Sequence, residues 1–137
     1  MNLLLLYESD FLDSEKKFAR LNDRRMEHLL SVCNVKKGES IKVGLFGGNM
    51  GLALITAIEQ SYIDLEVSLG LLPPAPIPLT LILALPRPKS LKKTLEAATT
   101  LGIKEIYIIE SWRVEKSYWS SPVVDRDSLN HHISLGL

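Results

Sequence analysis

Four basic side chains lie close together after an apolar run in the second half of the sequence. Arg87, Lys89, Lys92 and Lys93 fall within one seven-residue stretch that contains no acidic residue. Two interpretations stay open: a solvated helix face, or a turn that contacts phosphate at the start of a helix, where the helix dipole and free amides favour anions. Contacts of the second kind would position a nucleic-acid backbone without specifying its sequence.

A second candidate basic patch lies earlier in the chain. It consists of Arg24, Arg25, Lys36 and Lys37, with acidic residues interspersed among them. The whole chain has no net charge, so any attraction for nucleic acid must come from such local clusters.

Two interpretations also stay open for Arg113 and for the aromatic residues that follow it. Arg113 is expected at the carboxyl end of a sheet, where open α/β folds place ligands. Its alternative is a surface salt bridge to Glu110 or Glu115. Tyr118 and Trp119 either stack on a base or, as is more usual beside a proline, pack within the fold.

No set of residues in the sequence predicts catalysis or metal binding. His28 is expected to cap or pack a short helix, and the adjacent His131 and His132 point to different helix faces and so cannot share a metal. The sequence shows no Ser/His/Asp arrangement, Walker loop or GxGxxG motif. Cys33 is the only cysteine, which excludes a disulfide framework and favours a reducing, cytoplasmic setting.

The composition is that of a folded globular protein. Of 137 residues, 46% are hydrophobic and 23% are charged, which excludes a disordered chain. The apolar stretch 65–85 contains four prolines and cannot form a membrane-spanning helix, and the N-terminal apolar run lacks a basic flank. We therefore expect neither a membrane segment nor a targeting segment.

The proline cluster at 71–79 is expected to separate two lobes. In the first lobe, Asp23 is expected to cap a helix that ends at Val32. Apolar and polar residues alternate on either side of turn residues, a pattern that predicts strands. Several short strands in so short a segment predict a small, curled antiparallel β-barrel. The expected strands are 3–7, 17–21, 41–45, 52–58 and 63–69.

The second lobe has a β-α-β-α pattern. The run 79–85 is apolar throughout and predicts a parallel strand covered on both faces. Ser90 is expected to cap a helix that ends at Leu101, with Gly102 at the C′ position. A strand at 106–109 and a helix opened by Asp125 or Asp127 follow, and the apolar residues of that helix are Leu129, Ile133 and Leu137. The predicted buried face of the first helix consists of Leu91, Leu95, Ala98 and Leu101.

Two parallel strands with one crossover cannot bury both faces of a sheet. The second lobe is therefore expected to be the first half of a larger α/β domain. Either the chain is a fragment, or it completes the sheet with another chain.

Two stretches resemble the ribosomal RNA small subunit methyltransferase E family. DRRMEHLLSVCNVKKGESIKV (23–43) resembles the family's first signature, matched at Arg25, His28 and Gly38. LALPRPKSLKKTLEAATTLGIKEIYIIESWRVEKSYW (83–119) resembles its next block, matched at Arg87, Lys89 and Arg113. The resemblance extends over nearly the whole chain.

The sequence departs from the family pattern at three positions. Asn34 replaces the arginine of the first signature, Glu39 replaces its aspartate, and Thr100 replaces the glutamate before Leu-Gly. These departures suggest a divergent branch of the family.

The resemblance implies an α+β protein in which a PUA-like antiparallel β-barrel is followed by the first half of an α/β SPOUT methyltransferase domain. The implied domains are an RNA-binding barrel at 1–72, a linker at 73–78 and an incomplete methyltransferase part at 79–137. The family's C-terminal knot, which holds the cofactor, has no counterpart up to LGL at 135–137.

The resemblance also implies a function. Such enzymes use S-adenosylmethionine to methylate N3 of a uridine in 16S rRNA of the small ribosomal subunit, as cytoplasmic homodimers. A flipped or single-stranded uridine would be placed against the sulfonium methyl with N3 deprotonated. The candidate RNA-binding residues are Arg24, Arg25, His28, Lys36, Lys37, Arg87, Lys89, Lys92, Lys93 and Arg113.

We expect this chain alone to bind no S-adenosylmethionine, no metal and no DNA, and its catalytic residues stay unassigned. Two alternatives remain at this point: a non-enzymatic RNA-binding module, and a truncated partner that dimerises through its open sheet.

Overall fold

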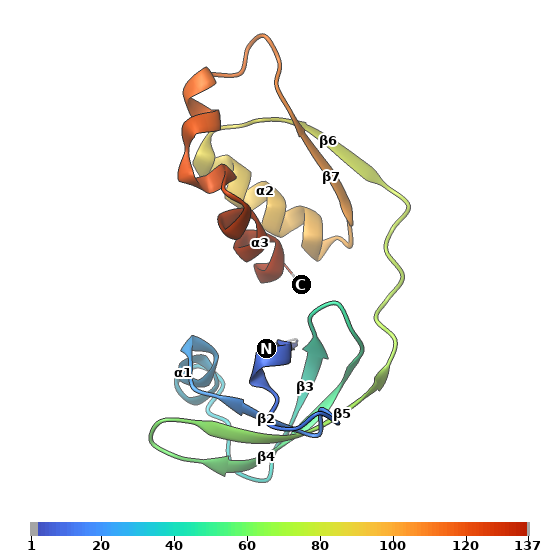
Figure 1. Ribbon diagram of the computed structural model, residues 1–137, viewed down its shortest axis with the longest axis vertical. Coiled ribbons are helices and arrows are strands. Elements are labelled where there is room, and N and C mark those ends of the chain that lie inside the picture. The colour runs from blue at the N-terminus through green and yellow to red at the C-terminus, as the bar shows by residue number, and fades with distance from the viewer. Residues whose placement is uncertain (1–2, 137) are drawn as a thin grey trace. The chain divides into compact units, whose positions relative to one another are not determined.

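The computed structural model describes residues 3–136 and divides between Pro73 and Pro74 into two compact units. Each unit has its own sheet and its own buried core (Figure 1). Residues 72–79 form no helix or strand. This agrees with their closely spaced prolines, which have no amide hydrogen to donate to a helix or sheet.

The first unit is built on a curled five-stranded sheet with the order β1-β3-β4-β5-β2. From β3 to β2 the neighbouring strands pair antiparallel, whereas β1 pairs parallel with β3. The predicted strands are all present. Their bounds are Leu4–Leu6 for β1, Phe18–Leu21 for β2, Ser40–Leu45 for β3, Met50–Ile58 for β4 and Ile63–Leu71 for β5.

The prediction of an antiparallel barrel is wrong in one respect. A 3₁₀ turn, η1 (Glu8–Asp10), directs the chain away after β1, and the connection to β3 includes β2 and the helix α1 (Arg24–Ser31). A connection of this length returns the chain to the start of the sheet, so β1 and β3 run in the same direction. The sheet is therefore mixed and open, with β1 and β2 at its two edges.

The helix α1 covers the buried face of this sheet. As predicted, Asp23 caps it by accepting a hydrogen bond from the amide of Arg25 at 2.9 Å. Met26 and Leu29 are buried in the same cluster as alternate residues of the strands. The strand residues in that cluster are Leu4, Leu6, Ala19, Leu21, Val43, Ala53, Ile55, Ile63, Leu65 and Val67.

Gly51 is required by the close approach of β4 to β5. The pairing between these strands shifts register between Met50 and Gly51. A Cβ at position 51 would lie far inside van der Waals contact of the Ser68 carbonyl oxygen, which is backbone and cannot swing aside. Only glycine fits this position without separating the two strands.

We predict that Gly51→Ala destabilises the first unit by about 2 kcal/mol, because the added methyl group must displace β5. Gly70→Ala is the matched control, since a Cβ there meets no atom within 4 Å and should change stability by less than about 0.5 kcal/mol. Urea unfolding followed by far-ultraviolet circular dichroism measures both. Equal urea midpoints for the two variants would contradict the requirement for glycine at position 51.

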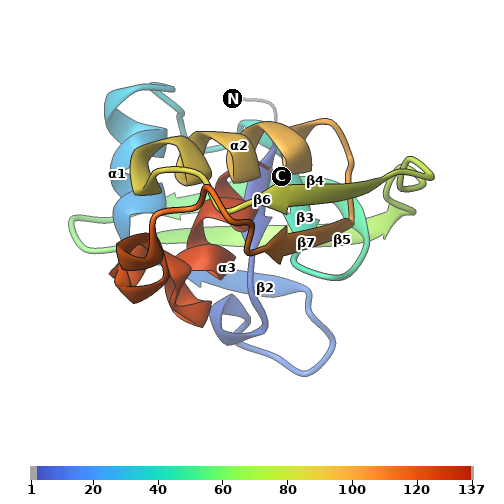
Figure 2. The ribbon, with the colours of Figure 1, turned by 90° about the horizontal axis from the view of Figure 1, so that it is seen from above.

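The second unit contains the predicted β-α-β-α order. Strand β6 (Thr80–Ala84) is followed by α2 (Pro88–Thr100) and by β7 (Glu105–Ile109), and β6 pairs parallel with β7 (Figure 2). Two 3₁₀ turns, η2 (Lys116–Ser120) and η3 (Pro122–Val124), precede α3 (Arg126–Leu135). The predicted helix extends to Leu137, which lies outside the described residues.

Within the described residues, β6 is covered on one face only, so this part of the chain does not by itself provide the expected cover on both faces. Burial alternates along both strands, and Ile82 and Tyr107 are 65% and 57% exposed. Leu83 and Ile108 point to the other face, where they pack against residues of α2 and α3. Both helices lie on one face of the two-stranded sheet (Figure 1), so the described chain covers that face only.

The bounds of α2 differ slightly from the prediction. The helix begins at Pro88, two residues before the predicted cap Ser90, because proline is well suited to the first helical position. Gly102 adopts φ +83° just after the C-cap residue Leu101, as predicted.

The buried face of α2 also differs at one position. Leu91, Leu95 and Ala98 are buried as predicted, but Leu101 is 67% exposed and Thr99 is buried instead. Gly136, just after α3, lies so close to Thr99 that a Cβ on it would overlap the threonine hydroxyl. The tertiary contact with α3 therefore decides which side of α2 is covered.

Candidate nucleic-acid interface

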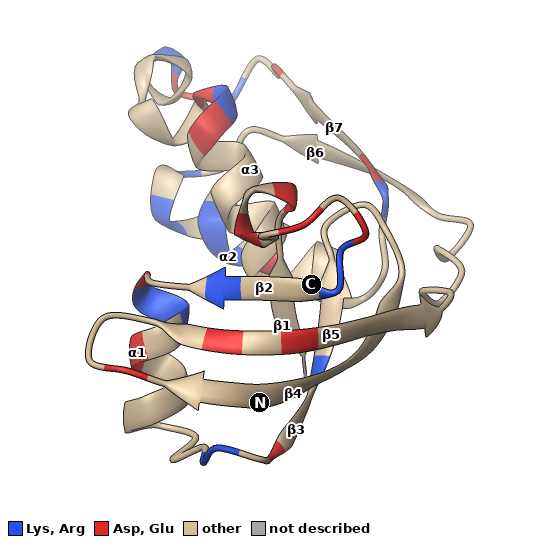
Figure 3. Cartoon of the chain, turned by 60° about the horizontal axis from the view of Figure 1, so that its bottom comes forward, with Lys and Arg blue, Asp and Glu red and all other residues tan. Residues whose placement is uncertain are grey.

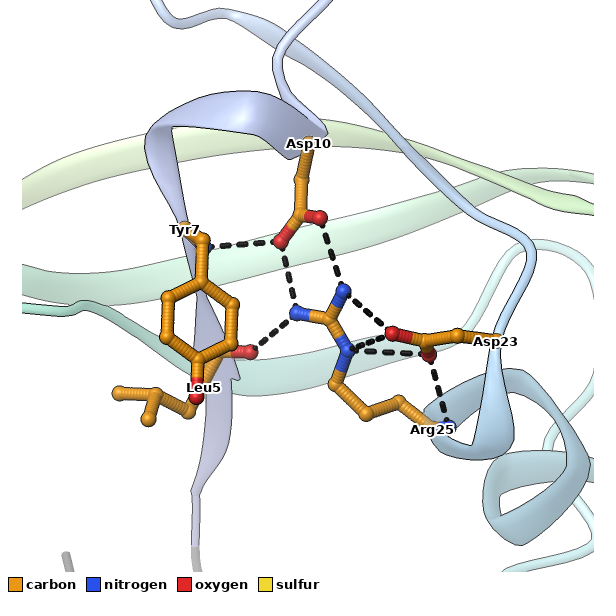
Figure 4. Close-up of polar contacts among 5 residues, drawn as sticks. All are labelled: Leu5, Tyr7, Asp10, Asp23 and Arg25. Atoms are coloured by element: carbon orange, nitrogen blue, oxygen red, sulfur yellow. Dashed lines mark hydrogen bonds and ion pairs between the residues drawn. The ribbon is translucent and has the colours of Figure 1, made fainter. Parts of the chain in front are cut away.

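Arg25 is the most extensively bonded of the predicted site residues (Figure 4). Its guanidinium holds the buried carboxylate of Asp10 in a bidentate pair, with N···O distances of 2.6 and 2.8 Å. It also bonds Asp23 through Nε and one terminal nitrogen, and donates to the Leu5 carbonyl at 2.8 Å. Four of its five N–H groups thus donate hydrogen bonds, and the terminal nitrogen that carries the fifth forms an ion pair with Asp23 at 2.8 Å.

The electrostatics of this cluster favour the charged forms. Burial alone would lower the pKa of Arg25, but its hydrogen bonds with Asp10 and Asp23 outweigh that effect and raise the pKa above its ordinary value. Partial burial would likewise raise the pKa of Asp23, but its bonds with Arg25 hold that pKa below 3.8. Arg25 is therefore a fixed cation.

Arg25 joins three segments of the first unit. Leu5 lies in β1, Asp10 ends η1, and Asp23 caps α1. Because its guanidinium is held by Asp10, Asp23 and the Leu5 carbonyl, the side chain stabilises this part of the fold and is not free to bind phosphate. Sequence reasoning missed the pair because its members are 15 residues apart and no periodicity relates them.

We predict that Arg25→Ala destabilises the first unit by about 3 kcal/mol, because it leaves the Asp10 carboxylate buried without its partner. The neighbouring Arg24→Ala is the control and should cost less than about 0.5 kcal/mol, since Arg24 is exposed. Both tryptophans, Trp112 and Trp119, lie in the second unit. In urea unfolding, Arg25→Ala should therefore lower the midpoint of the circular-dichroism transition and leave the midpoint of the tryptophan-fluorescence transition unchanged. An unshifted dichroism transition would contradict the structural role.

The other candidates of the first unit lie on its surface. Arg24 and His28 are exposed one turn apart on α1, on the side away from its buried residues. Lys36 and Lys37 are exposed in the turn before β3, where Gly38 adopts φ +88°. These four side chains remain available to a ligand.

The second unit brings two more candidate segments to one end of its sheet. The residues Ala84 and Ile109 are paired neighbours in parallel strands, so the chain leaves both strands at the same end. Arg87 follows β6 by three residues, and Trp112 and Arg113 follow β7. This is the carboxyl end of the sheet, where the sequence analysis places Arg113.

Arg87 occupies the N-cap position of α2 and makes no side-chain capping bond. Lys89, Lys92 and Lys93 follow in the first two turns, which contain no acidic residue, and Figure 3 shows the basic residues of α2 in blue. Among residues 3–136, none of these four cations forms an ion pair. The positive end of the helix dipole adds to their charge.

Arg113 forms neither of the alternative salt bridges within the described chain. Its guanidinium lies instead over the ring of Trp112, 4.3 Å from the ring centroid. Trp112 is 86% exposed and was not singled out by sequence reasoning, since nothing in the sequence separates a projecting tryptophan from a packed one. Tyr118 packs against the core of the second unit, as the packing interpretation predicts, and Trp119 is 38% exposed.

The histidines of α3 have different roles. His132 bonds Glu96 of α2 through Nδ1 at 2.8 Å, whereas His131 is exposed. Within residues 3–136, no three His, Cys, Asp or Glu side chains group as metal ligands. The helices in this part of the chain are also too short or too polar to cross a bilayer.

With this geometry in place, residues 73–135 match the RNA methyltransferase domain family. Ribosomal RNA small subunit methyltransferase E of Treponema pallidum is 25% identical over 135 residues, which make up 98% of this chain and 51% of that protein. The chain thus spans about half the length of this curated relative.

Solved structures show the same fold. A probable rRNA methyltransferase from Porphyromonas gingivalis superposes with a TM-score of 0.68 at 21% identity, over 96% of this chain and 53% of that one. The ribosomal RNA small subunit methyltransferase E of Neisseria gonorrhoeae, bound to S-adenosyl methionine, gives 0.62 at 22% identity, over 82% and 48%. Residues 73–135 are thus similar in sequence to the RNA methyltransferase domain, and the described chain is similar in fold to these solved structures. Its resemblance to the ribosomal RNA small subunit methyltransferase E family is confirmed.

Proposed function

We propose that this chain forms the RNA-binding part of an S-adenosylmethionine-dependent methyltransferase that modifies N3 of a uridine in 16S rRNA. The first unit would be the PUA-like RNA-binding domain, and the second would belong to a SPOUT domain. The active protein would be a cytoplasmic homodimer that acts on the small ribosomal subunit. The family match at 73–135 and the name of the Treponema pallidum relative support this proposal.

The arrangement of cations in the second unit is the observation on which the proposal rests. The segments that follow the two parallel strands at one end of the sheet contain Arg87 and Arg113. The first two turns of α2 then add Lys89, Lys92 and Lys93. No carboxylate within the described chain pairs with any of them. Unpaired cations beside a helix N-terminus suit a phosphate backbone, which needs charge and amide donors.

These residues would bind and orient RNA without reading its sequence. Lysine and arginine contacts to phosphate fix the register of a strand on the protein surface. Arg24, His28, Lys36 and Lys37 would contribute similar contacts from the first unit. The transfer itself requires a methyl donor held against a correctly placed uridine, and S-adenosylmethionine supplies that methyl group when bound.

The described residues do not by themselves fit S-adenosylmethionine. A cofactor of this kind needs a concave, largely apolar pocket with a few polar groups inside it. Within residues 74–136, the segments that leave the carboxyl end of the sheet present the exposed side chains of Arg87, Trp112 and Arg113. We therefore assign no step of the transfer to these residues beyond binding the substrate.

We predict that the double variant Arg87→Ala, Lys89→Ala binds single-stranded RNA more weakly. It should also reduce the slope of log affinity against log salt by about 1.4, or about 0.7 for each phosphate that is no longer neutralised. Filter binding at several salt concentrations measures both quantities. The matched control Lys42→Ala, Lys104→Ala removes two exposed lysines elsewhere and should keep the slope. Unchanged affinity and slope in the first variant would refute phosphate binding by the turn.

We also predict that calorimetric titration of the 137-residue chain with S-adenosylmethionine gives no saturable heat, because the segments at the carboxyl end of the sheet in residues 74–136 present exposed side chains. Titration with single-stranded RNA in the same buffer is the positive control and should give a saturable signal at low salt. Tight cofactor binding by the chain alone would overturn the division of roles proposed above.

A further inference from the structure

We propose that the indole of Trp112 is a stacking platform for an unpaired RNA base, backed on its other face by Arg113. This inference rests on the proposed RNA-binding function and deepens it. It adds a residue that the sequence analysis did not single out, and it names the ligand as a base of single-stranded RNA.

The exposure of Trp112 is the first observation. At 86% it is the most exposed large hydrophobic side chain of the described residues, and Trp112 does not belong to the core cluster of its unit. A tryptophan buries a large area when it packs, so leaving one in water forfeits that stabilisation. Within the described chain, no packing contact explains why an indole is placed here.

The backbone holds the ring in a defined position. Trp112 and Arg113 are the two central residues of a turn that is closed by a hydrogen bond from the Val114 amide to the Ser111 carbonyl at 2.9 Å. Val114 packs against the core of the second unit, which fixes the end of the turn. The indole therefore projects from an anchored turn directly after β7.

Arg113 occupies one face of the indole and leaves the other face for a ligand. Its guanidinium lies 4.3 Å from the ring centroid and has no carboxylate partner within the described residues. A base that stacks on the open face completes a base–indole–guanidinium sandwich. The uncompensated charge also attracts the neighbouring phosphates of the strand.

The position of the platform at the carboxyl end of the sheet links it to the basic turn. Ala84 and Ile109 are paired at the ends of the two strands, and Arg87 and Trp112 each follow three residues later in the chain. Cations that bind a backbone beside an aromatic ring that binds a base are the usual arrangement for single strands. A base within a duplex already has neighbours on both faces, so the platform selects unpaired RNA.

The test compares single-stranded and duplex RNA on the full chain. We expect Trp112→Leu to weaken binding of a labelled oligouridylate by about five- to a hundredfold, the usual range for removal of one stacking side chain. Trp112→Phe should retain most of the affinity. Binding of a duplex RNA should be unchanged, and the salt slope of Trp112→Leu should equal that of the wild type because no charge is removed.

Two further measurements complete the test. In a Trp119→Phe background, Trp112 is the only tryptophan, and oligouridylate should quench its fluorescence. Leu101→Ala, which truncates another exposed apolar side chain, is the control and should bind like the wild type. Circular dichroism of each variant confirms that it is folded.

The outcomes separate this inference from the proposed function. Trp112→Leu could bind oligouridylate like the wild type while the double variant Arg87→Ala, Lys89→Ala binds it more weakly. In that case the stacking role of Trp112 is wrong and the RNA-binding function stands. Equal losses for single-stranded and duplex RNA also contradict the platform. If the wild-type chain binds neither RNA, both proposals fail.

Discussion

Two parallel strands cannot be joined by a tight turn, because both begin at the same end of the sheet. The chain must therefore run back over the length of the first strand before it enters the second. Both units of this protein contain such a pair. The connection from β1 to β3 includes α1, and the connection from β6 to β7 is α2. Each returning helix packs on its own sheet, and each carries basic residues of the candidate interface.

The same pairing determines where those basic residues lie. In the second unit, the register that opposes Ala84 to Ile109 brings the segments after both strands to one end of the sheet. Residues that are more than twenty positions apart in the sequence, such as Arg87 and Arg113, are thereby presented at the same end. A hairpin would have sent them to opposite ends.

Arg25 and Arg87 differ in burial and therefore in role. Arg25 is 17% exposed, and two carboxylates and a carbonyl hold its guanidinium, so its charge stabilises the fold. Arg87 is exposed at a helix N-terminus, and within residues 3–136 no carboxylate neutralises it. The sequence analysis matched both arginines to signatures of the family it resembles, so a matched position does not by itself distinguish a structural residue from a candidate ligand contact.

The sequence predicted the local structure well and the tertiary structure in part. Alternation, the Asp23 cap and the C′ glycine Gly102 identified the elements, because these signals act over a few residues. The parallel pairing of β1, the Asp10–Arg25 pair and the burial of Thr99 depend on contacts between distant segments, which no periodicity encodes. The exposure of Trp112 was missed for the same reason, since an apolar residue after a strand is usually packed.

The one-sided packing of β6 and β7 has a consequence for handling the protein. Each strand of a two-stranded sheet is an outer strand and leaves half of its backbone donors and acceptors without a partner in that sheet. The stretch 79–85 has neither charge nor proline and has high β-propensity, a composition typical of segments that assemble into fibrils. In concentrated preparations, aggregation should therefore begin in the second unit, at these strands.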